Sequence, residues 1–236
     1  MVKGYIFDYG GTLDTGGNHW GKVIWHAYER VGVPVDEALF REAYVHGERT
    51  LGRNPIIQPD FTFRQTLEQK IRLQLEFIES RCPEVTRLKY GEQLLDDLYS
   101  RTCEETTRSR NVLLQLHERF PMVLVSNFYG NIATVLREFS LDGIFQQIVE
   151  SAVVGIRKPD PRIFLLGVEA LGLKPEEVMV VGDSLDKDII PACQAGCHAV
   201  WLRGEGWTPY NGDCPTCETI DSLDELLKII EKKYTT

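Results

Sequence analysis

Short apolar runs alternate with helical patterns over most of this chain, and that alternation limits the possible folds more than any other feature. Uninterrupted apolar runs are typical of strands buried on both faces of a parallel sheet, in which helices connect one strand to the next. We expect strands at residues 2–7, 122–125, 147–149, 178–181 and 199–202. We expect helices near residues 111–119, 131–139, 161–171, 185–195 and 222–232. The pattern predicts an α/β fold in which helices cover both faces of a parallel sheet.

One long segment departs from this alternation. Residues 16–104 contain no convincing strand, and their apolar residues recur at the spacing of a helix face. The clearest example is the series Leu67, Ile71, Leu75 and Ile78. The simplest account is a helical insertion that follows the first strand.

Composition favours small-molecule chemistry. The chain has 236 residues, 43% of them hydrophobic, which is enough for one sizeable core and a smaller inserted domain. Its formal net charge of -9 disfavours nucleic acid as a partner, because affinity for the phosphate backbone depends on clustered Lys and Arg. The first apolar run begins at residue 1, so we expect no secretory leader, and no later segment approaches a membrane span. We therefore expect a cytoplasmic protein with neither a nucleic-acid nor a membrane partner.

The cysteines are expected to be reduced in that compartment. Cys214 and Cys217 have the C-x-x-C spacing of a metal site, and Cys193, Cys197 and His198 precede them. A structural zinc site usually needs a second pair of this kind, which the sequence lacks. We expect Cys214 and Cys217 to be reduced and free of metal.

Polar side chains stand where the expected strands end. Asp8 follows the first strand, Ser126 and Asn127 follow the second, and Asp183 follows the fourth. Lys158 lies in a loop before a later helix, from which it can reach the same edge. In an open parallel sheet, ligands bind at the carboxyl edge, where the strand order reverses.

Each of these residues alone is typical of a helix cap or a turn. Together they supply what phosphoryl transfer requires: a nucleophile, acidic ligands for a divalent cation, and donors around the phosphoryl oxygens. The combination predicts a phosphoryl-transfer site at the carboxyl edge of the sheet.

Four motifs, in order, resemble those of the haloacid dehalogenase-like (HAD) hydrolases. The first is FDYGGTL at residues 7–13, the second is Ser126 at a strand end, the third is Lys158, and the fourth is Gly-Asp at 182–183 with a further acid at Asp188. The helical insertion resembles the cap of the subclass that carries it after the first motif. The resemblance implies a Rossmann-like catalytic core of residues 1–15 and 105–236, and an all-helical cap domain of residues 16–104.

The resemblance also implies a role for each motif residue. Asp8 is the expected nucleophile, which forms an aspartyl-phosphate that water then hydrolyses. Ser126 and the amide of Asn127 are expected to bind phosphoryl oxygens, and Lys158 to neutralise charge on them and on Asp8. The substrate is expected to be a small phosphorylated molecule.

The expected cofactor is Mg²⁺, because a dianionic phosphate approaches clustered carboxylates only when positive charge offsets the repulsion. Its implied ligands are Asp8, Asp183 and the backbone carbonyl of Gly10. Asp188 resembles a supporting acid that orients Lys158 or a metal-bound water.

The chain departs from the family pattern at Gly10, where most phosphatases of the family have a second Asp. Glycine retains the carbonyl but lacks the acid that protonates the leaving oxygen, a role worth roughly 10²–10⁴ in rate. This departure leaves open what supplies the proton, and it disfavours ordinary alkyl phosphates as substrates.

Three other functions stay open for the same reason. A phosphonatase would need a Schiff-base lysine in the cap, at Lys22, Lys70 or Lys89. A haloacid dehalogenase also lacks the second Asp but works without metal, which the Gly182-Asp183 motif and Asp188 disfavour. A catalytically weakened protein would bind metal and phosphate without turnover.

The cap is expected to select the substrate, because it closes over the sheet edge and excludes water. Its candidate contact residues are Trp20, Tyr44, His46, Arg49, Arg53 and Arg64. The arginines could clamp a second anionic group, although a solvated helix face is the better explanation for any one of them taken alone.

Overall fold

A six-stranded parallel sheet forms the centre of the molecule, with the strand order β3-β2-β1-β4-β5-β6. The computed structural model describes residues 1–208, 210 and 217–234. The strands are β1 (Gly4–Phe7), β2 (Met122–Ser126), β3 (Gln147–Glu150), β4 (Val178–Gly182), β5 (His198–Leu202) and β6 (Glu218–Ile220). The expected α/β class and its five strands are confirmed. The sixth, β6, was not predicted, because its three residues are too few to show a periodic pattern.

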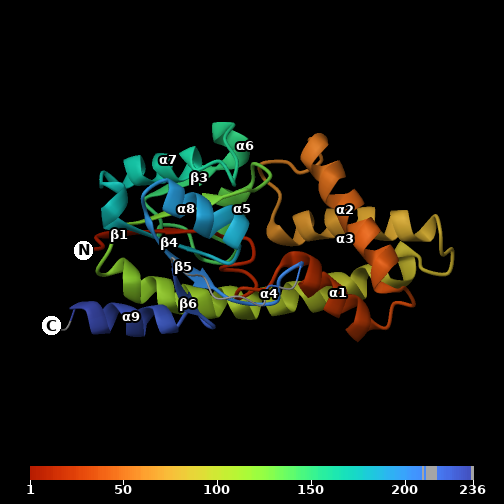
Figure 1. Cartoon of the computed structure of the whole chain (residues 1–236). Helices are drawn as coiled ribbons and strands as arrows, with labels where there is room; N and C mark the ends of the chain where they lie inside the picture. Colours follow the sequence, from red (N-terminus) through yellow and green to blue (C-terminus); the bar gives the residue numbers. More distant parts are fainter. Residues whose placement is uncertain (209, 211–216, 235–236) are drawn as a thin grey trace.

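Helices lie between most successive strands in the sequence and cover the sheet (Figure 1). Between β1 and β2 lie α1 (Trp20–Val31), α2 (Glu37–Arg53), α3 (Phe63–Glu79) and α4 (Arg87–His117). The later helices are α5 (Ile132–Glu138), α6 (Ser151–Val154), α7 (Arg162–Leu171), the 3₁₀ turn η1 (Pro175–Glu177), the π-turn η2 (Leu185–Ile189), α8 (Ile190–Gln194) and α9 (Glu225–Tyr234).

Both faces of the sheet are covered, as the apolar runs predicted. Alternate residues of a strand point to opposite faces, so Tyr5 and Phe7 of β1 pack in one cluster and Ile6 packs in the other. The first cluster includes apolar residues of α4, α5 and α9, and the second those of α7 and α8. The arrangement is Rossmann-like.

The segment between β1 and β2 is a helical insertion, as expected. Figure 1 shows α1, α2, α3 and one end of α4 grouped beyond the edge of the sheet. α4 is a single helix of 31 residues whose far end packs on the sheet through Val112, Leu113 and Leu116. The predicted boundary between residues 104 and 105 therefore falls inside a continuous helix, and the division into core and cap stays a prediction.

One helix prediction needs correction and one is confirmed. The helix expected near residues 111–119 is only the last part of α4, which begins at Arg87 within the insertion. The helix expected near residues 185–195 is confirmed, although its first part is the π-turn η2, which passes directly into α8 close to Pro191, a residue without a backbone N–H. Ser184 caps this segment by accepting a hydrogen bond from the Lys187 backbone.

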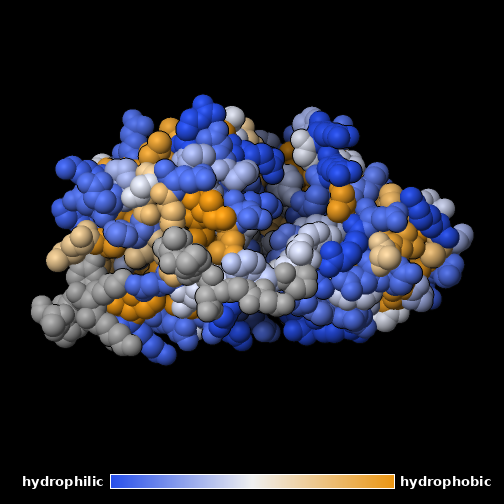
Figure 2. All heavy atoms as spheres, in the orientation of Figure 1, coloured by the Kyte–Doolittle hydropathy of each residue, from blue (hydrophilic) through white to orange (hydrophobic). Residues whose placement is uncertain are grey.

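The surface on the side drawn in Figure 2 is predominantly hydrophilic, with small apolar areas between polar side chains. None of the helices in the described ranges is long and apolar enough to cross a membrane.

The cysteines follow the expectation only in part. Cys82, Cys103, Cys193 and Cys197 are free. Cys217 is disulfide-bonded, so the expectation that it is reduced is wrong. That expectation came from the usual redox state of a compartment, which does not decide the state of an individual cysteine. Cys214 lies outside the described residues.

Candidate functional site

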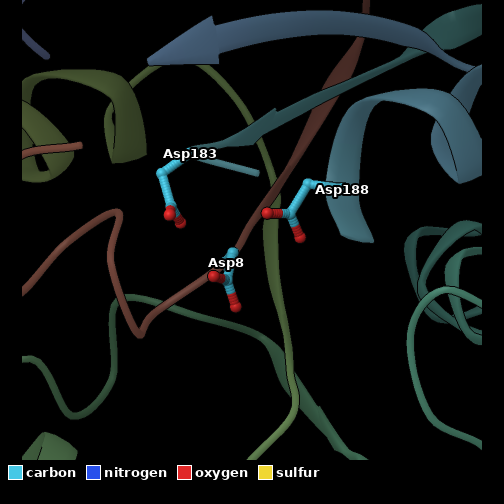
Figure 3. A group of neighbouring side chains, drawn as sticks. All are labelled: Asp8, Asp183 and Asp188. Carbon is cyan, nitrogen blue, oxygen red and sulfur yellow. The ribbon is translucent and has the colours of Figure 1, made fainter. Parts of the chain in front are cut away.

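Three carboxylates converge at the carboxyl edge of the sheet (Figure 3). Asp8 follows β1, Asp183 follows β4, and Asp188 comes from η2. One oxygen of each carboxylate lies within 4.8 Å of the others. Because β1 and β4 are neighbours while β1 also pairs with β2, the cluster lies where the strand order reverses, the usual ligand position in such sheets.

Lys158 joins two of these acids. Its Nζ lies 2.6 Å from Asp8 Oδ1 and 2.6 Å from Asp188 Oδ1, and all three side chains are buried. Burial alone lowers the Lys158 pKa, but the carboxylates of Asp188 and Asp8 raise it overall. The ammonium therefore stays charged between them.

Asn127 positions the Lys158 loop. Its Nδ2 donates a hydrogen bond to the Lys158 carbonyl at 3.1 Å, and its Oδ1 accepts one from the Lys158 backbone N–H at 3.0 Å. Both polar atoms of the Asn127 side chain are thus hydrogen-bonded to Lys158, so any contact that Asn127 makes with a ligand would come from its backbone.

Asp183 and Asp188 carry more negative charge than Lys158 offsets. Burial, then the neighbouring carboxylates Asp188 and Asp8, raise the pKa of Asp183. Burial also raises the pKa of Asp188. Oxygen donors in this crowded arrangement suit a divalent cation, whose charge would favour the ionised forms. The residues present therefore fit Mg²⁺.

The other polar atoms around Asp183 hold it in place. Thr12 Oγ1 donates to Asp183 Oδ1 at 3.0 Å, and Trp201 Nε1 donates to the Asp183 carbonyl at 2.8 Å. Asp188 Oδ2 accepts a hydrogen bond from the Ser184 backbone at 3.1 Å. With Lys158 on its Oδ1, Asp188 has both oxygens engaged, whereas Asp183 Oδ2 makes no hydrogen bond with the described residues.

Ser126 has a buried hydroxyl that makes no hydrogen bond with the described residues. The residue ends β2 and lines the same cleft as the carboxylates. A buried polar atom without a partner is uncommon in a folded protein and needs an explanation. A ligand oxygen in the cleft would supply the missing partner.

The two glycines of the loop after β1 differ in their surroundings. Gly11 has a φ of 100°, and a Cβ there would lie 2.5 Å from both carboxylate oxygens of Asp183. Gly10 is outside the left-handed region, and apart from its two chain neighbours no atom of the described residues lies within 4 Å of the place that its Cβ would occupy. Gly11 is therefore required by the backbone, while Gly10 leaves open space where a side chain would fit.

A cleft of about 1000 Å³ connects the carboxylates with the helical insertion. Four of the predicted contact residues line it, namely Trp20, Tyr44, Arg49 and Arg53. The other two do not. His46 stacks on Phe77 in a neighbouring groove, and Arg64 pairs with Asp96 at 2.7 Å.

Lys70 is the member of the predicted lysine set that lines the cleft. Its Nζ pairs with Glu48 at 2.9 Å, and the Tyr129 hydroxyl donates to the same carboxylate at 2.7 Å. Lys22 instead pairs with Glu37 at 3.1 Å, and the Lys89 ammonium lies over a tyrosine ring. Burial lowers the Lys70 pKa, but Glu48 raises it well above its ordinary value overall.

Asp14 is a cleft residue that the sequence analysis missed. It is buried, and its carboxylate accepts hydrogen bonds from the Gly11 backbone at 2.7 Å and from Trp20 Nε1 at 3.0 Å. Burial raises its pKa to about 7. The sequence signal was its place directly after the first motif, six residues after Asp8, where the family pattern drew attention to Gly10 instead.

Comparison with known proteins agrees with the class that this geometry defines, a Rossmann-like protein with an acidic site at its strand-order reversal. The model of the haloacid dehalogenase-like hydrolases matches residues 2–196, so the chain belongs to that family.

Curated relatives match the chain over part of their length. Glyceraldehyde 3-phosphate phosphatase from Methanopyrus kandleri is 40% identical over 91 residues, which are 37% of this chain and 39% of that relative. The enzyme of the same name from Pyrococcus abyssi is 28% identical over 134 residues, which are 55% of this chain and 56% of that relative. The chain thus matches less than two thirds of the length of these relatives.

Solved structures match over nearly the whole chain. A dehalogenase with an intermediate complex has a TM-score of 0.64 at 21% identity, with 97% of this chain and 96% of that chain covered. At this identity the likeness shows the fold alone.

Proposed function

We propose that the protein is a Mg²⁺-dependent phosphohydrolase that acts on small phosphorylated metabolites through an aspartyl-phosphate. The observation that supports this most directly is Asp8 at the strand-order reversal, paired with Lys158 and in the same cleft as the Ser126 hydroxyl, which has no hydrogen-bond partner in the described part of the chain. The phosphatase names of the partial relatives agree with it. The cytoplasm stays the predicted compartment.

The contacts of Asp8 indicate which of its oxygens reacts. Lys158 Nζ holds Oδ1, so Oδ2 is the nucleophile that attacks phosphorus while the bond to the leaving oxygen breaks. Water then cleaves the aspartyl-phosphate, which releases inorganic phosphate and restores the carboxylate. Ser126 Oγ and the Asn127 backbone amide bind phosphoryl oxygens, and Lys158 offsets their charge.

Asp8, Asp183 and the Gly10 carbonyl would hold Mg²⁺, which would supply positive charge to the phosphoryl oxygens. Asp188, with both oxygens engaged by Lys158 and Ser184, is the positioning residue for Lys158. Gly10 offers no proton for the leaving oxygen, so substrates with good leaving groups, such as acyl phosphates, are favoured.

The structure bears on the phosphonatase alternative through Lys70. A Schiff-base lysine must lose its proton, whereas the Glu48 carboxylate keeps Lys70 protonated. The dehalogenase alternative is disfavoured by the three clustered acids, which suit a cation.

The test is a panel of phosphate esters, acyl phosphates and phosphonates, assayed with Mg²⁺ and with EDTA. We expect turnover only with Mg²⁺, and none in Asp8→Asn, because an amide cannot form the acyl-phosphate. Asp186→Asn is the matched control, since Asp186 is exposed on η2 and does not line the cleft. Undiminished turnover in EDTA or in Asp8→Asn would contradict the assignment. Metal binding without turnover on any substrate would favour the catalytically weakened alternative.

A further inference from the structure

Three arginine side chains make no hydrogen bond, ion pair or ring contact with any residue that the structure describes, and all three line the cleft. They are Arg49, Arg53 and Arg157. Every other arginine has a partner, such as Arg41 with Glu37 or Arg64 with Asp96. In a chain with a formal net charge of -9, unpaired cations that gather at one place call for an explanation.

These arginines approach the cleft from two sides. Arg49 and Arg53 lie one turn apart on α2, so they share one face of that helix. Arg157 lies in the loop between α6 and α7, next to Lys158 at the acidic cluster. Figure 1 shows α2 across from the end of the sheet at which α6 lies.

None of the described acids of the cleft forms an ion pair with these arginines. Glu48 is held by Lys70 and Tyr129, and Asp14 by the Gly11 amide and Trp20. His19 also lines the cleft, and burial lowers its pKa to about 4, which leaves it neutral at pH 7. The three guanidinium groups are therefore free to pair with an anion that enters the cleft.

We propose that Arg49, Arg53 and Arg157 form a subsite for a second oxyanion of the substrate, beside the phosphoryl site at Asp8. The preferred substrate is then a small phosphorylated molecule that also carries a carboxylate or a second phosphate. Guanidinium groups suit this role because their donors bind two oxygens of a carboxylate or phosphate at once. That the substrate is hydrolysed rests on the proposed phosphohydrolase function, while the selectivity for a second anion does not.

The test measures binding of two phosphonates that cannot be hydrolysed as esters. In the presence of Mg²⁺, 3-phosphonopropionate carries a carboxylate and propylphosphonate carries a methyl group in its place. We expect the carboxylate compound to bind the wild-type protein about 10-fold or more tightly, as charge-assisted hydrogen bonds allow. Propane-1,3-bisphosphonate is the third probe, and whichever doubly anionic probe binds more tightly identifies the preferred oxyanion.

Single variants locate the effect. Arg49→Ala, Arg53→Ala and Arg157→Ala are each expected to reduce the preference for the doubly anionic probe several-fold, with little change for propylphosphonate. Arg64→Ala is the matched control, because this cap arginine pairs with Asp96 away from the cleft. Arg157 is the most informative position, since Arg49 and Arg53 also line the neighbouring groove.

Equal affinity for the singly and doubly anionic probes, failure of both to bind, or a preference that survives in all three variants would overturn the inference. Hydrolysis of phosphorylated substrates without a preference for the doubly anionic probe would also overturn the subsite inference, but it would leave the proposed function standing. The preference without hydrolysis would support the subsite and count against the phosphohydrolase.

Discussion

Gly10 stands at the position where an acid would complete the catalytic set, and its surroundings leave room for one. Its chain neighbours aside, the part of the chain that the structure describes places no atom within 4 Å of a Cβ at this position, and the φ of Gly10 is outside the left-handed region. Neither space nor backbone conformation therefore requires glycine here.

We predict that Gly10→Asp raises the turnover of alkyl phosphates relative to aryl phosphates. Alkyl leaving oxygens need a proton and aryl ones do not, so the ratio of the two kcat/KM values should rise by up to about 10². Gly10→Ala is the control, because it adds a side chain without an acid and should leave the ratio unchanged. An unchanged ratio in a folded, metal-binding Gly10→Asp variant would refute the idea that acid catalysis is the missing part.

Asp14 should make stability depend on pH. The folded protein holds its proton up to about pH 7, whereas the unfolded chain releases it near the ordinary value of 3.8. Between these values the folded state binds more protons, so the contribution of Asp14 to the free energy of unfolding falls as pH rises, by up to about 1.4 kcal/mol per pH unit.

We predict that Asp14→Asn, which cannot titrate, gains stability relative to wild type as pH rises from 5 to 7. The amide has only one acceptor for the Gly11 and Trp20 donors, but that loss is the same at every pH. Urea denaturation of both proteins in EDTA, repeated across this range, measures the difference. Parallel stability curves for the two proteins would show that the Asp14 pKa is not raised.

Sequence reasoning found the polar residues at strand ends, because a parallel sheet brings all its carboxyl ends to one edge. Asp8, Ser126, Lys158 and Asp183 do line one cleft. Arg157 was missed although it precedes Lys158, because only packing shows that its side chain lacks a partner. Glu48 and Tyr129 were missed for a related reason, since their hydrogen bond depends on how α2 meets the loop after β2.

At the scale of elements, the end of β4 packs closely against η2, which carries Asp188 of the acidic cluster. A Cβ on Gly182, the last residue of β4, would overlap the Cβ of Asp188 in η2. This close approach is what lets Asp188 reach Lys158. The glycine is thus required by packing, in contrast to Gly10.

We predict that Gly182→Ala displaces η2, lowers the free energy of unfolding by about 1–3 kcal/mol and reduces turnover, because the added methyl overpacks the site. Thermal denaturation and the phosphatase assay measure the two effects. Gly52→Ala on α2 is the control, since its methyl would meet open space and should be neutral or stabilise the helix by up to about 1 kcal/mol. Equal stability of the two variants would show that η2 adapts without strain.

Element boundaries were less predictable than element types. The apolar pattern identifies α4 near the sheet but not its continuation into the insertion, where its exposed face is polar. β6 lies at the sheet edge, and its short sequence carries no alternation. The continuation of α4 and the strand β6 both depend on contacts with residues far away in the sequence, and a local sequence pattern gives no information about such contacts.

At the scale of the molecule, a partly buried ionic group connects the helical insertion to the sheet. Glu48 of α2 accepts a hydrogen bond from Tyr129, which lies in the loop after β2, and it also pairs with Lys70 of α3. Asn131 adds a hydrogen bond from the core to the Phe61 carbonyl at 2.9 Å. These contacts hold the insertion over the carboxylates.

We predict that Tyr129→Phe loosens this closure, because it removes a hydrogen bond to a charged carboxylate, a contact typically worth about 1.5–3 kcal/mol. Amide hydrogen exchange in α2 should become roughly 10-fold faster or more, while exchange in the central strands stays unchanged. Tyr44→Phe is the control, since it removes a cleft hydroxyl that makes no hydrogen bond between insertion and core in the described residues. Identical α2 exchange in the two variants would show that closure does not depend on Tyr129.

The pairing of β1 with β4 also has a consequence for the order of folding. The Thr12 hydroxyl donates a hydrogen bond to the Asp183 carboxylate, and the two residues are 171 positions apart in the sequence. Both β2 and β3 lie between them, so this contact requires that β4 pairs with β1 across a long stretch of chain. A partly assembled sheet of β1, β2 and β3 therefore lacks the acidic cluster and its repulsion. Such long-range pairings form slowly, because chain entropy must be lost before their contacts form. A cation or oxyanion that binds this cluster thus stabilises the complete sheet over every partly assembled one.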